Sequence, residues 1–298
     1  MTDKEHYVRL GSQLLNPFLC TSASLTEAGG LLLACVPVIV ENASQTVVGS
    51  SWLTALVPGQ RSVVLLHGVQ SSRLSWWRIE QDLTDLDWQV HAVDLLGHGD
   101  RAALGPEQLS VEDLARDVLE VVPGPVDLLV GHSLGAIVAL TAVQLAPHYT
   151  TALVIEDPPG LAGSVHLDEV ADRIVNSIQQ TRADPATALQ SLPAENPVWS
   201  FVDVQNAVQN RLRLDLTRVT GLLRTEHWDL QSLVGHCPVP LQLLAATRDS
   251  TLLEPDRTAV MNLLPKDQIT IVDSGHTIHR ERPGLWLQAV LQFASPIL

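Results

Sequence analysis

Five residues, Gly131-His132-Ser133-Leu134-Gly135, form a G-x-S-x-G pattern in which the serine could act as a nucleophile. A short apolar run at 126–130 precedes the pattern and predicts a strand, and a helix-like run at 134–146 follows it and is ended by Pro147. A serine at such a strand-to-helix turn is held in a strained conformation that exposes its hydroxyl. The flanking glycines let the backbone turn without a side-chain clash. The setting between a strand and a helix therefore predicts a reactive serine.

A serine hydroxyl is a weak nucleophile at neutral pH and needs a base within hydrogen-bond reach. Two downstream residues could complete the group, because each follows a predicted strand: Asp249 after 239–245, and His276 after 268–272. His276 would take the serine proton and later protonate the leaving group, while Asp249 would orient the imidazole. Since the carboxyl ends of parallel strands meet at one edge of a sheet, the three side chains can converge there.

Strand and helix signals alternate along most of the chain. Strands are predicted at 31–40, 47–57, 62–67, 89–94, 126–131, 151–156, 239–245 and 268–272, and helices at 75–86, 110–122, 134–146, 255–264 and 284–293. This alternation predicts an α/β fold with a mostly parallel, eight-stranded sheet and helices on both faces.

The alternation breaks after Pro158-Pro159-Gly160, and residues 161–228 have the pattern of several amphipathic helices. An insertion at this point lies at the carboxyl ends of the strands, where open α/β sheets bind ligands. We therefore expect an N-terminal extension at 1–30, a core formed by 31–160 and 229–298, and a helical cap (lid) at 161–228. Trp199, Phe201 and Trp228 are candidates to line a moderately hydrophobic substrate pocket under the cap, although ordinary packing explains them equally well.

The chain resembles the α/β-hydrolase fold superfamily, of the cap-bearing serine esterase, lactonase and carbon–carbon hydrolase kind. The resemblance covers about residues 60–298 and rests on His67-Gly68-Val69, Asp94-Leu95-Leu96-Gly97-His98-Gly99, the serine pattern, Asp249, and Gly275-His276 with Glu281-Arg282-Pro283. In that superfamily the nucleophile comes first, the acid second and the histidine last, which is the order found here. The oxyanion hole would use the backbone N–H of Leu134 and, by similarity, that of Val69.

The catalytic acid stays open at this point. Glu156 and Asp157 end the strand at 151–156, and some members of the superfamily take their acid from there. Asp249 is favoured because its separation from His276 is usual for the family. His279 could compete as the base, but His276 follows Gly275 as in the family pattern.

The composition excludes several classes of partner. The 298 residues are 46% hydrophobic and 17% charged, and a net charge of −15 argues against binding to nucleic acid or to an anionic membrane. The three cysteines, Cys20, Cys35 and Cys237, form neither a zinc-like pair nor a disulfide framework, which suits a reducing compartment. The first residues lack the basic-then-apolar pattern of a signal peptide, so we expect a cytoplasmic protein. The sequence specifies no oligomeric state.

The sequence therefore predicts a serine hydrolase that cleaves a carboxylic ester or lactone of a small molecule through an acyl-enzyme. No cofactor is expected, and no metal either, because no metal-ligand spacing such as His-x-x-x-His occurs. The alternatives are a carbon–carbon bond hydrolase or a perhydrolase on the same triad, a slow-turnover ligand-binding protein of the same fold, and a cofactor-free lyase or oxygenase.

Overall fold

The computed structural model describes residues 9–10, 13–14, 56–57, 59–160 and 167–298. Its contacts divide the chain into two units, Met1–Ser50 and Ser51–Leu298. In the first unit, β1 (Arg9–Leu10) pairs antiparallel with β2 (Gln13–Leu14). The predicted boundary at residue 30, the predicted strand at 31–40 and nearly all of the one at 47–57 lie outside the described residues.

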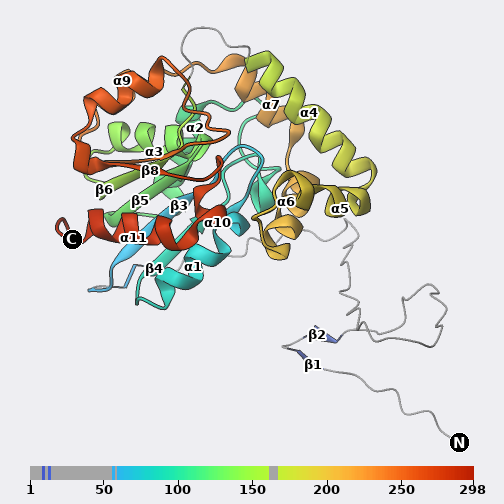
Figure 1. The fold of residues 1–298 in the computed structure, drawn as a ribbon, viewed down its shortest axis with the longest axis horizontal. Helices are drawn as coiled ribbons and strands as arrows, with labels where there is room; N and C mark the ends of the chain where they lie inside the picture. Colours follow the sequence, from blue (N-terminus) through green and yellow to red (C-terminus); the bar gives the residue numbers. More distant parts are fainter. Residues whose placement is uncertain (1–8, 11–12, 15–55, 58, 161–166) are drawn as a thin grey trace, which may run out of the picture. The chain divides into compact units, whose positions relative to one another are not determined.

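Six parallel strands form the sheet of the second unit (Figure 1), in the spatial order β4-β3-β5-β6-β7-β8. They are β3 (Ser62–Leu66), β4 (Gln89–Val93), β5 (Val126–His132), β6 (Thr150–Glu156), β7 (Leu241–Ala246) and β8 (Ile269–Val272). The predicted α/β class with a parallel sheet is confirmed. The described residues contain six of its strands rather than the eight expected.

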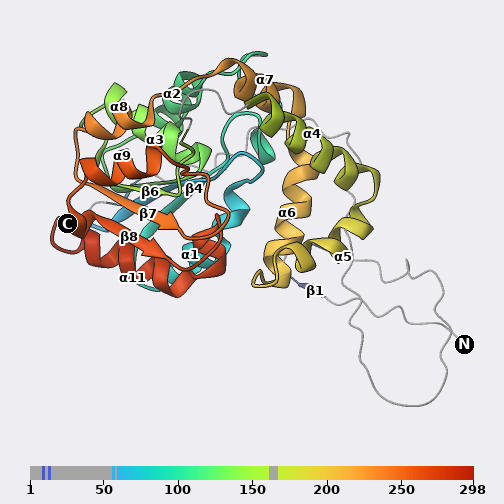
Figure 2. The ribbon, with the colours of Figure 1, turned by 45° about the horizontal axis from the view of Figure 1, so that its top comes forward.

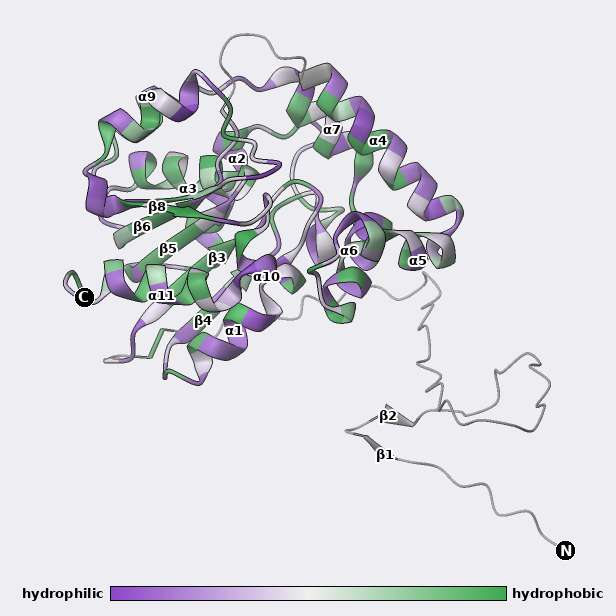
Figure 3. Cartoon of the chain, viewed as in Figure 1, coloured by the Kyte–Doolittle hydropathy of each residue, from purple (hydrophilic) through white to green (hydrophobic). Residues whose placement is uncertain are grey.

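Apolar residues alternate between the two faces of the sheet, because successive side chains of a strand point to opposite sides. Val63 and Leu65 of β3 belong to one buried cluster, while Val64 and Leu66 belong to another. The first cluster is closed by α1 (Trp77–Thr84) and α11 (Pro283–Ala294), and the second by α2 (Val111–Val121), α3 (Leu134–Leu145), α8 (Leu230–Gly235) and α9 (Asp256–Leu263). Figure 3 shows the resulting hydrophobic colouring of the strands and of α3.

Four helices stand between β6 and α8 in the chain and gather on one side of the sheet (Figures 1 and 2). They are α4 (Leu167–Ala183), α5 (Pro185–Glu195), α6 (Phe201–Arg213) and α7 (Leu216–Thr225). Side-chain caps start three of them: Asp184, Ser200 and Asp215 each accept a hydrogen bond from a backbone N–H of the first turn. This stretch is helical, as the sequence predicts.

Helix α6 is hydrogen-bonded to the segments that follow β3. Asn206 donates to the Leu74 carbonyl oxygen (2.9 Å), and the Trp77 indole N–H donates to Asp203 (2.9 Å). Leu74 belongs to a 3₁₀ turn at Arg73–Trp76, and further short turns lie at Gly99–Arg101 (η2), Lys266–Gln268 (η3) and Ile278–Glu281 (α10). The described helices are all too short or too polar to cross a bilayer.

The turn between β5 and α3 depends on two glycines. A Cβ atom on Gly131 would lie 2.2 Å from the carbonyl oxygen of Gly135, and one on Gly135 would lie 2.4 Å from that of Leu66. Both obstacles are backbone atoms, which cannot rotate away as a side chain can. The glycines of the G-x-S-x-G pattern therefore let β5, α3 and β3 approach one another closely.

Replacing Gly131 by alanine should destabilise the fold, because the new methyl group overlaps this backbone. We expect the free energy of unfolding to fall by about 1–3 kcal/mol, as for other overpacked sites, measured by urea denaturation. The matched control is Gly221→Ala in α7, where an added Cβ meets nothing within 4 Å. This variant should be neutral or more stable by about 0.5–1 kcal/mol, since alanine favours a helix. Equal effects of the two substitutions would contradict the close-approach argument.

Candidate functional site

Ser133 lies at the tip of the turn between β5 and α3 with φ 53° and ψ −120°, a region that residues other than glycine seldom adopt. Its backbone N–H donates to the carbonyl oxygen of Glu156 (2.9 Å), which ties the turn to the end of β6. Its hydroxyl has no hydrogen-bond partner among the described residues. The strained turn thus presents an uncommitted hydroxyl at the carboxyl edge of the sheet.

His276 is paired with Asp157, and Asp249 does not reach it. The distance from His276 Nδ1 to Asp157 Oδ2 is 2.6 Å. The Asp157 side chain is fully buried, whereas the His276 side chain is 25% exposed. A carboxylate only accepts hydrogen bonds, so Nδ1 carries the proton and Nε2 is left as the acceptor. This is the tautomer that a general base for Ser133 requires.

Four hydrogen bonds hold the Asp157 carboxylate in place. Besides His276, Oδ1 accepts from the Ala246 N–H (3.1 Å) and the Ser250 hydroxyl (2.6 Å), and Oδ2 accepts from the Thr251 N–H (3.0 Å). Two carboxylate oxygens offer about four lone-pair positions, so the group is saturated. The loop after β7 thus supplies donors to the acid at the end of β6.

The expected contact of Asp249 with His276 is a point where the prediction is wrong. Asp249 has φ 49° and is exposed, while the two residues that follow it turn inward onto Asp157. The left-handed backbone at 249 directs Ser250 and Thr251 to the carboxylate and leaves Asp249 in solvent. The alternative that the sequence left open, a carboxylate at the end of β6, is the one that meets His276.

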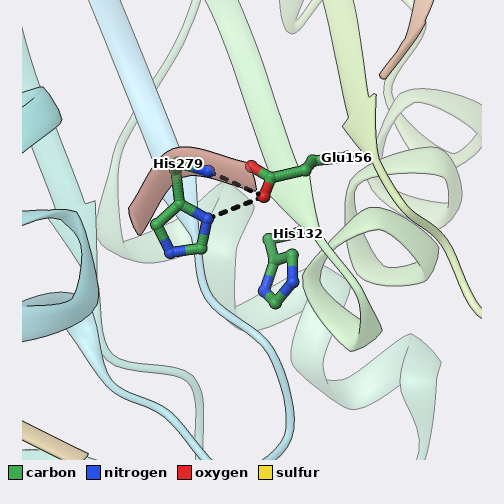
Figure 4. A group of neighbouring side chains, drawn as sticks. All are labelled: His132, Glu156 and His279. Atoms are coloured by element: carbon green, nitrogen blue, oxygen red, sulfur yellow. Dashed lines mark hydrogen bonds and ion pairs between the residues drawn. The ribbon is translucent and has the colours of Figure 1, made fainter. Parts of the chain in front are cut away.

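Glu156 and His279 form a second, buried carboxylate–histidine pair (Figure 4). Glu156 Oε1 accepts from the backbone N–H (3.1 Å) and Nδ1 (2.8 Å) of His279, and Oε2 accepts from the Trp286 indole (2.8 Å). Burial raises the pKa of Glu156 and lowers the pKa of His279 well below its usual value. His279 is 1% exposed and binds Glu156 through both its Nδ1 and its backbone N–H, so it holds α10 to the sheet.

His132 joins this pair in a compact group that deserves a test as a metal site. One ligand atom from each of His132, Glu156 and His279 lies within 4.8 Å of the others (Figure 4). Most of the ligand atoms are already engaged: His132 Nε2 lies 3.1 Å from the His276 carbonyl oxygen, and Glu156 binds three N–H groups, whereas the buried His279 Nε2 has no partner among the described residues. The donor set therefore fits a hydrogen-bonded packing network better than a metal site.

The two expected oxyanion donors, the Leu134 and Val69 N–H groups, belong to segments that lie next to Ser133. Leu134 is the first residue of α3, so its N–H has no acceptor within the helix. On the other side, a Cβ added to Gly68 would lie 3.1 Å from Ser133 Cβ, so the strand end that precedes Val69 passes directly beside the serine. The Val69 carbonyl oxygen lies 2.8 Å from His98 Nε2, which orients this segment.

Of the three candidate pocket residues, Trp199 has the most direct contact with the site. Its indole N–H donates to the Thr277 hydroxyl (3.1 Å), next to His276, and the Arg280 guanidinium lies 4.7 Å from its ring centre. Trp228 donates to the Pro159 carbonyl oxygen (3.0 Å), close to Asp157 in the chain. Phe201 is 60% exposed at the start of α6, so its expected place in the pocket is not met.

Sequence reasoning missed three residues of this site. Ser250 and Thr251 anchor Asp157, and their only signal is a pair of small hydroxyl residues directly after Asp249. Arg280 contacts Trp199 and, through Nη2, the Ser71 hydroxyl (3.0 Å). Its signal is a single cation one helical turn beyond His276.

Comparisons with known proteins identify the family and agree with the fold. A family model described as "Alpha/beta hydrolase family" matches residues 63–289. The chain is 28% identical to a putative 2-succinyl-6-hydroxy-2,4-cyclohexadiene-1-carboxylate synthase of Bacillus subtilis, over 79% of this chain and 91% of the relative. It is 32% identical to a pimeloyl-[acyl-carrier protein] methyl ester esterase of Methylococcus capsulatus, over 63% and 76%. The crystal structure of E-2-(acetamidomethylene)succinate hydrolase has a similar fold, with TM-score 0.66, 18% identity, and coverage of 79% and 91%.

Substitution of each candidate acid in turn should show which of the two acts on His276. Asp157→Asn should lower kcat for ester hydrolysis by about 10³–10⁴-fold, because an amide can donate to His276 Nδ1 and so favour the wrong tautomer. Asp249→Asn is the matched control, with the same change of charge on an exposed side chain, and should leave kcat within about threefold of wild type. A larger loss for Asp249→Asn would assign the acid to the loop after β7.

The buried histidines predict a loss of stability in mild acid. Burial lowers the pKa of five of them below the value of about 6.5 in the unfolded chain: His67, His91, His98, His132 and His279. Below pH 6.5 the unfolded chain therefore binds more protons than the folded one, so the free energy of unfolding falls as the pH falls. Urea denaturation at about pH 7.5 and about pH 5.5 measures this effect. The free energy of unfolding should fall by up to about 1.4 kcal/mol per histidine for each pH unit below 6.5. The raised pKa of Glu156 acts in the opposite direction, and a stability that is constant or rises toward acid would contradict the prediction.

Proposed function

The chain belongs to the alpha/beta hydrolase family and is a hydrolase, and we propose that it cleaves a carboxylic ester or a lactone through an acyl-enzyme on Ser133. One observation carries the proposal: the 2.6 Å hydrogen bond between His276 Nδ1 and the buried Asp157, at the sheet edge where Ser133 has φ 53°. A histidine oriented in this way, at the same sheet edge as a serine whose hydroxyl has no partner among the described residues, supplies the parts of a nucleophilic triad.

In the first half-reaction the Ser133 oxygen attacks the substrate carbonyl carbon, and its proton passes to His276 Nε2. The imidazolium that forms is stabilised by Asp157, whose carboxylate stays ionised. The hydrogen bonds of Ser250 and Thr251 keep that carboxylate fixed during the transfer. His276 then gives the proton to the leaving alcohol, and the carbonyl re-forms as an ester of Ser133.

In the second half-reaction a water molecule attacks the acyl-enzyme. His276 takes a proton from the water, and the tetrahedral intermediate collapses to release the acid and restore the Ser133 hydroxyl. The Val69 and Leu134 N–H groups would bind the oxyanion in both halves. Loss of one such donor typically costs about 2.7–4 kcal/mol of transition-state stabilisation.

The helices α4 to α7 would act as a cap (lid) over this edge. The support is contact with the loops that carry the chemistry: Trp199 donates to Thr277, and Asn206 donates to Leu74. Trp199 is half-buried and gives the pocket an aromatic wall, which suits a small, moderately hydrophobic substrate. We place this reaction in the cytoplasm, as the cysteine usage suggests.

A second candidate is a synthase reaction like the one named for the Bacillus subtilis relative. Carbon–carbon hydrolysis and perhydrolysis also remain compatible with the same three residues.

Labelling with a fluorophosphonate tests the proposed nucleophile. We expect a covalent adduct on Ser133, found by peptide mass spectrometry, because the probe reacts with a serine activated by a histidine. Ser133→Ala should abolish labelling and lower ester hydrolysis on the order of 10⁶-fold. His276→Ala should remove labelling as well. His227→Ala, at an exposed histidine between α7 and α8, is the control and should label like wild type.

The substrate assays separate the candidates from one another. Turnover of p-nitrophenyl esters and simple lactones supports the ester or lactone reaction, whereas turnover only of a ring-cleavage diketone supports the carbon–carbon reaction. Turnover of a synthase substrate without turnover of any ester would favour the second candidate, and full activity of Ser133→Ala on the preferred substrate would contradict the acyl-enzyme route. Labelling without turnover of any of these substrates would identify a ligand-binding protein that keeps the triad.

A further inference from the structure

Arg280 carries a positive charge beside the candidate site without a carboxylate partner. Its Nη2 donates to the Ser71 hydroxyl (3.0 Å), and its guanidinium stacks on Trp199. Its Nε is buried and has no hydrogen-bond partner among the described residues. Burial lowers the pKa of Arg280 to about 10, so the group is still charged at neutral pH.

The two acids that act on Arg280 at longer range are committed elsewhere. Asp203 accepts from the Trp77 indole through Oδ1 and from the N–H and hydroxyl of Ser200 through Oδ2. Glu156 uses both oxygens on His279 and Trp286. Burying an uncompensated charge is costly, and protein interiors usually pair such a charge. The missing partner of Arg280 is therefore an anion that the described residues do not supply.

Arg280 is hydrogen-bonded both to the turn that contains Val69 and to the segment that follows His276. Ser71, its hydrogen-bond partner, donates its own N–H to the Gly68 carbonyl oxygen (3.1 Å), so it closes the turn that contains Val69. Cα atoms that span such a turn are less than about 7 Å apart. On the other side, the Arg280 N–H donates to the Thr277 carbonyl oxygen (3.1 Å), directly after His276. An anion on the guanidinium would thus lie beside the oxyanion turn and the base.

The surroundings of Arg280 add further positive and donor character. Asn210 is 2% exposed, and its Nδ2 has no partner, although its Oδ1 accepts from the Ser72 hydroxyl (2.5 Å). Arg211, the next residue of α6, contributes a second positive charge that acts on Arg280. The chain has a net charge of −15, so a group of two cations and an unpaired amide donor is contrary to its overall charge and favours an anionic ligand at this position.

We propose that Arg280 binds a carboxylate on the acyl part of the substrate, so that the enzyme prefers monoesters of short dicarboxylic acids to neutral esters. The proposal rests on the hydrolase function proposed above for the same site. A guanidinium presents its N–H donors as a planar fork that matches a carboxylate, and Arg280 uses one nitrogen of that fork on Ser71. The acyl part is the relevant one, because its carbonyl oxygen would sit at the Val69 N–H, in the turn that Ser71 closes.

The test compares the monomethyl and dimethyl esters of succinic, glutaric and adipic acid with the full-length protein. Wild type should hydrolyse the monoester of at least one chain length with kcat/KM about tenfold or more above that of its diester, as one charge-assisted hydrogen bond would provide. This comparison needs no variant, so it does not depend on how well any substitution folds.

Arg280→Gln should lower kcat/KM for the preferred monoester by about 10–100-fold and for the diester by less than about threefold. Arg280→Lys keeps the charge but not the fork, so its monoester activity should fall between that of wild type and that of Arg280→Gln. Arg213→Gln is the control for the loss of one positive charge from α6, because its guanidinium binds Asp100 at the surface. It should keep the wild-type preference.

The rate of fluorophosphonate labelling separates failure of this proposal from failure of the proposed function. If Ser133 of wild type is labelled but monoesters are not preferred, the carboxylate proposal is overturned and the hydrolase stands. If Arg280→Gln lowers both esters and labelling equally, Arg280 only positions the Ser71 turn, and the proposal is again overturned. If wild type takes no label at all, the proposed function itself fails.

Discussion

The geometry of the site depends on the way β6 ends. Two adjacent carboxylates, Glu156 and Asp157, each bind a histidine from the segment that follows β8. Neighbouring residues at a strand end point to different sides. The Glu156–His279 pair therefore lies in the core, and the Asp157–His276 pair lies at the surface of the site. The buried pair fixes α10 against the sheet through His279. That attachment sets the position of His276, three residues earlier in the chain, relative to Asp157.

Much of this fold could be predicted because its hydrophobic pattern is local. The apolar runs of the six strands and the residues around Ser133 specify the sheet and the turn without reference to distant parts of the chain. The turn at Gly131 and Gly135 could also be predicted, because no residue with a side chain fits so close an approach of the backbone. The histidine could also be predicted, since it follows a glycine directly after the last strand.

The acid could not be chosen from the sequence, because Asp157 and Asp249 both follow a strand and both have positive φ. Which of them faces the histidine depends on the path of two loops that pack on each other. The same limit applies to Trp199 and Phe201, which are two residues apart. Trp199 is half-buried and Phe201 is exposed, because α6 begins at the Ser200 cap that lies between them. The role of Arg280 could not be predicted from the sequence for a related reason. Its lack of a carboxylate partner depends on the hydrogen bonds that Asp203 and Glu156 make with other groups in the fold.

The anchoring of Asp157 has an evolutionary consequence for the loop between β7 and α9. In the arrangement described, that loop supplies two hydroxyls, from Ser250 to the carboxylate and from Thr251 to the Asp157 carbonyl oxygen, and one backbone N–H, from Thr251 to the carboxylate. Threonine could replace Ser250 and serine could replace Thr251, because either residue keeps a hydroxyl and a backbone N–H at its position. Selection on this loop is therefore weak compared with a loop that must keep an acid at a single position. Its sequence can drift among descendants of this chain, while the two carboxylates at the end of β6 cannot.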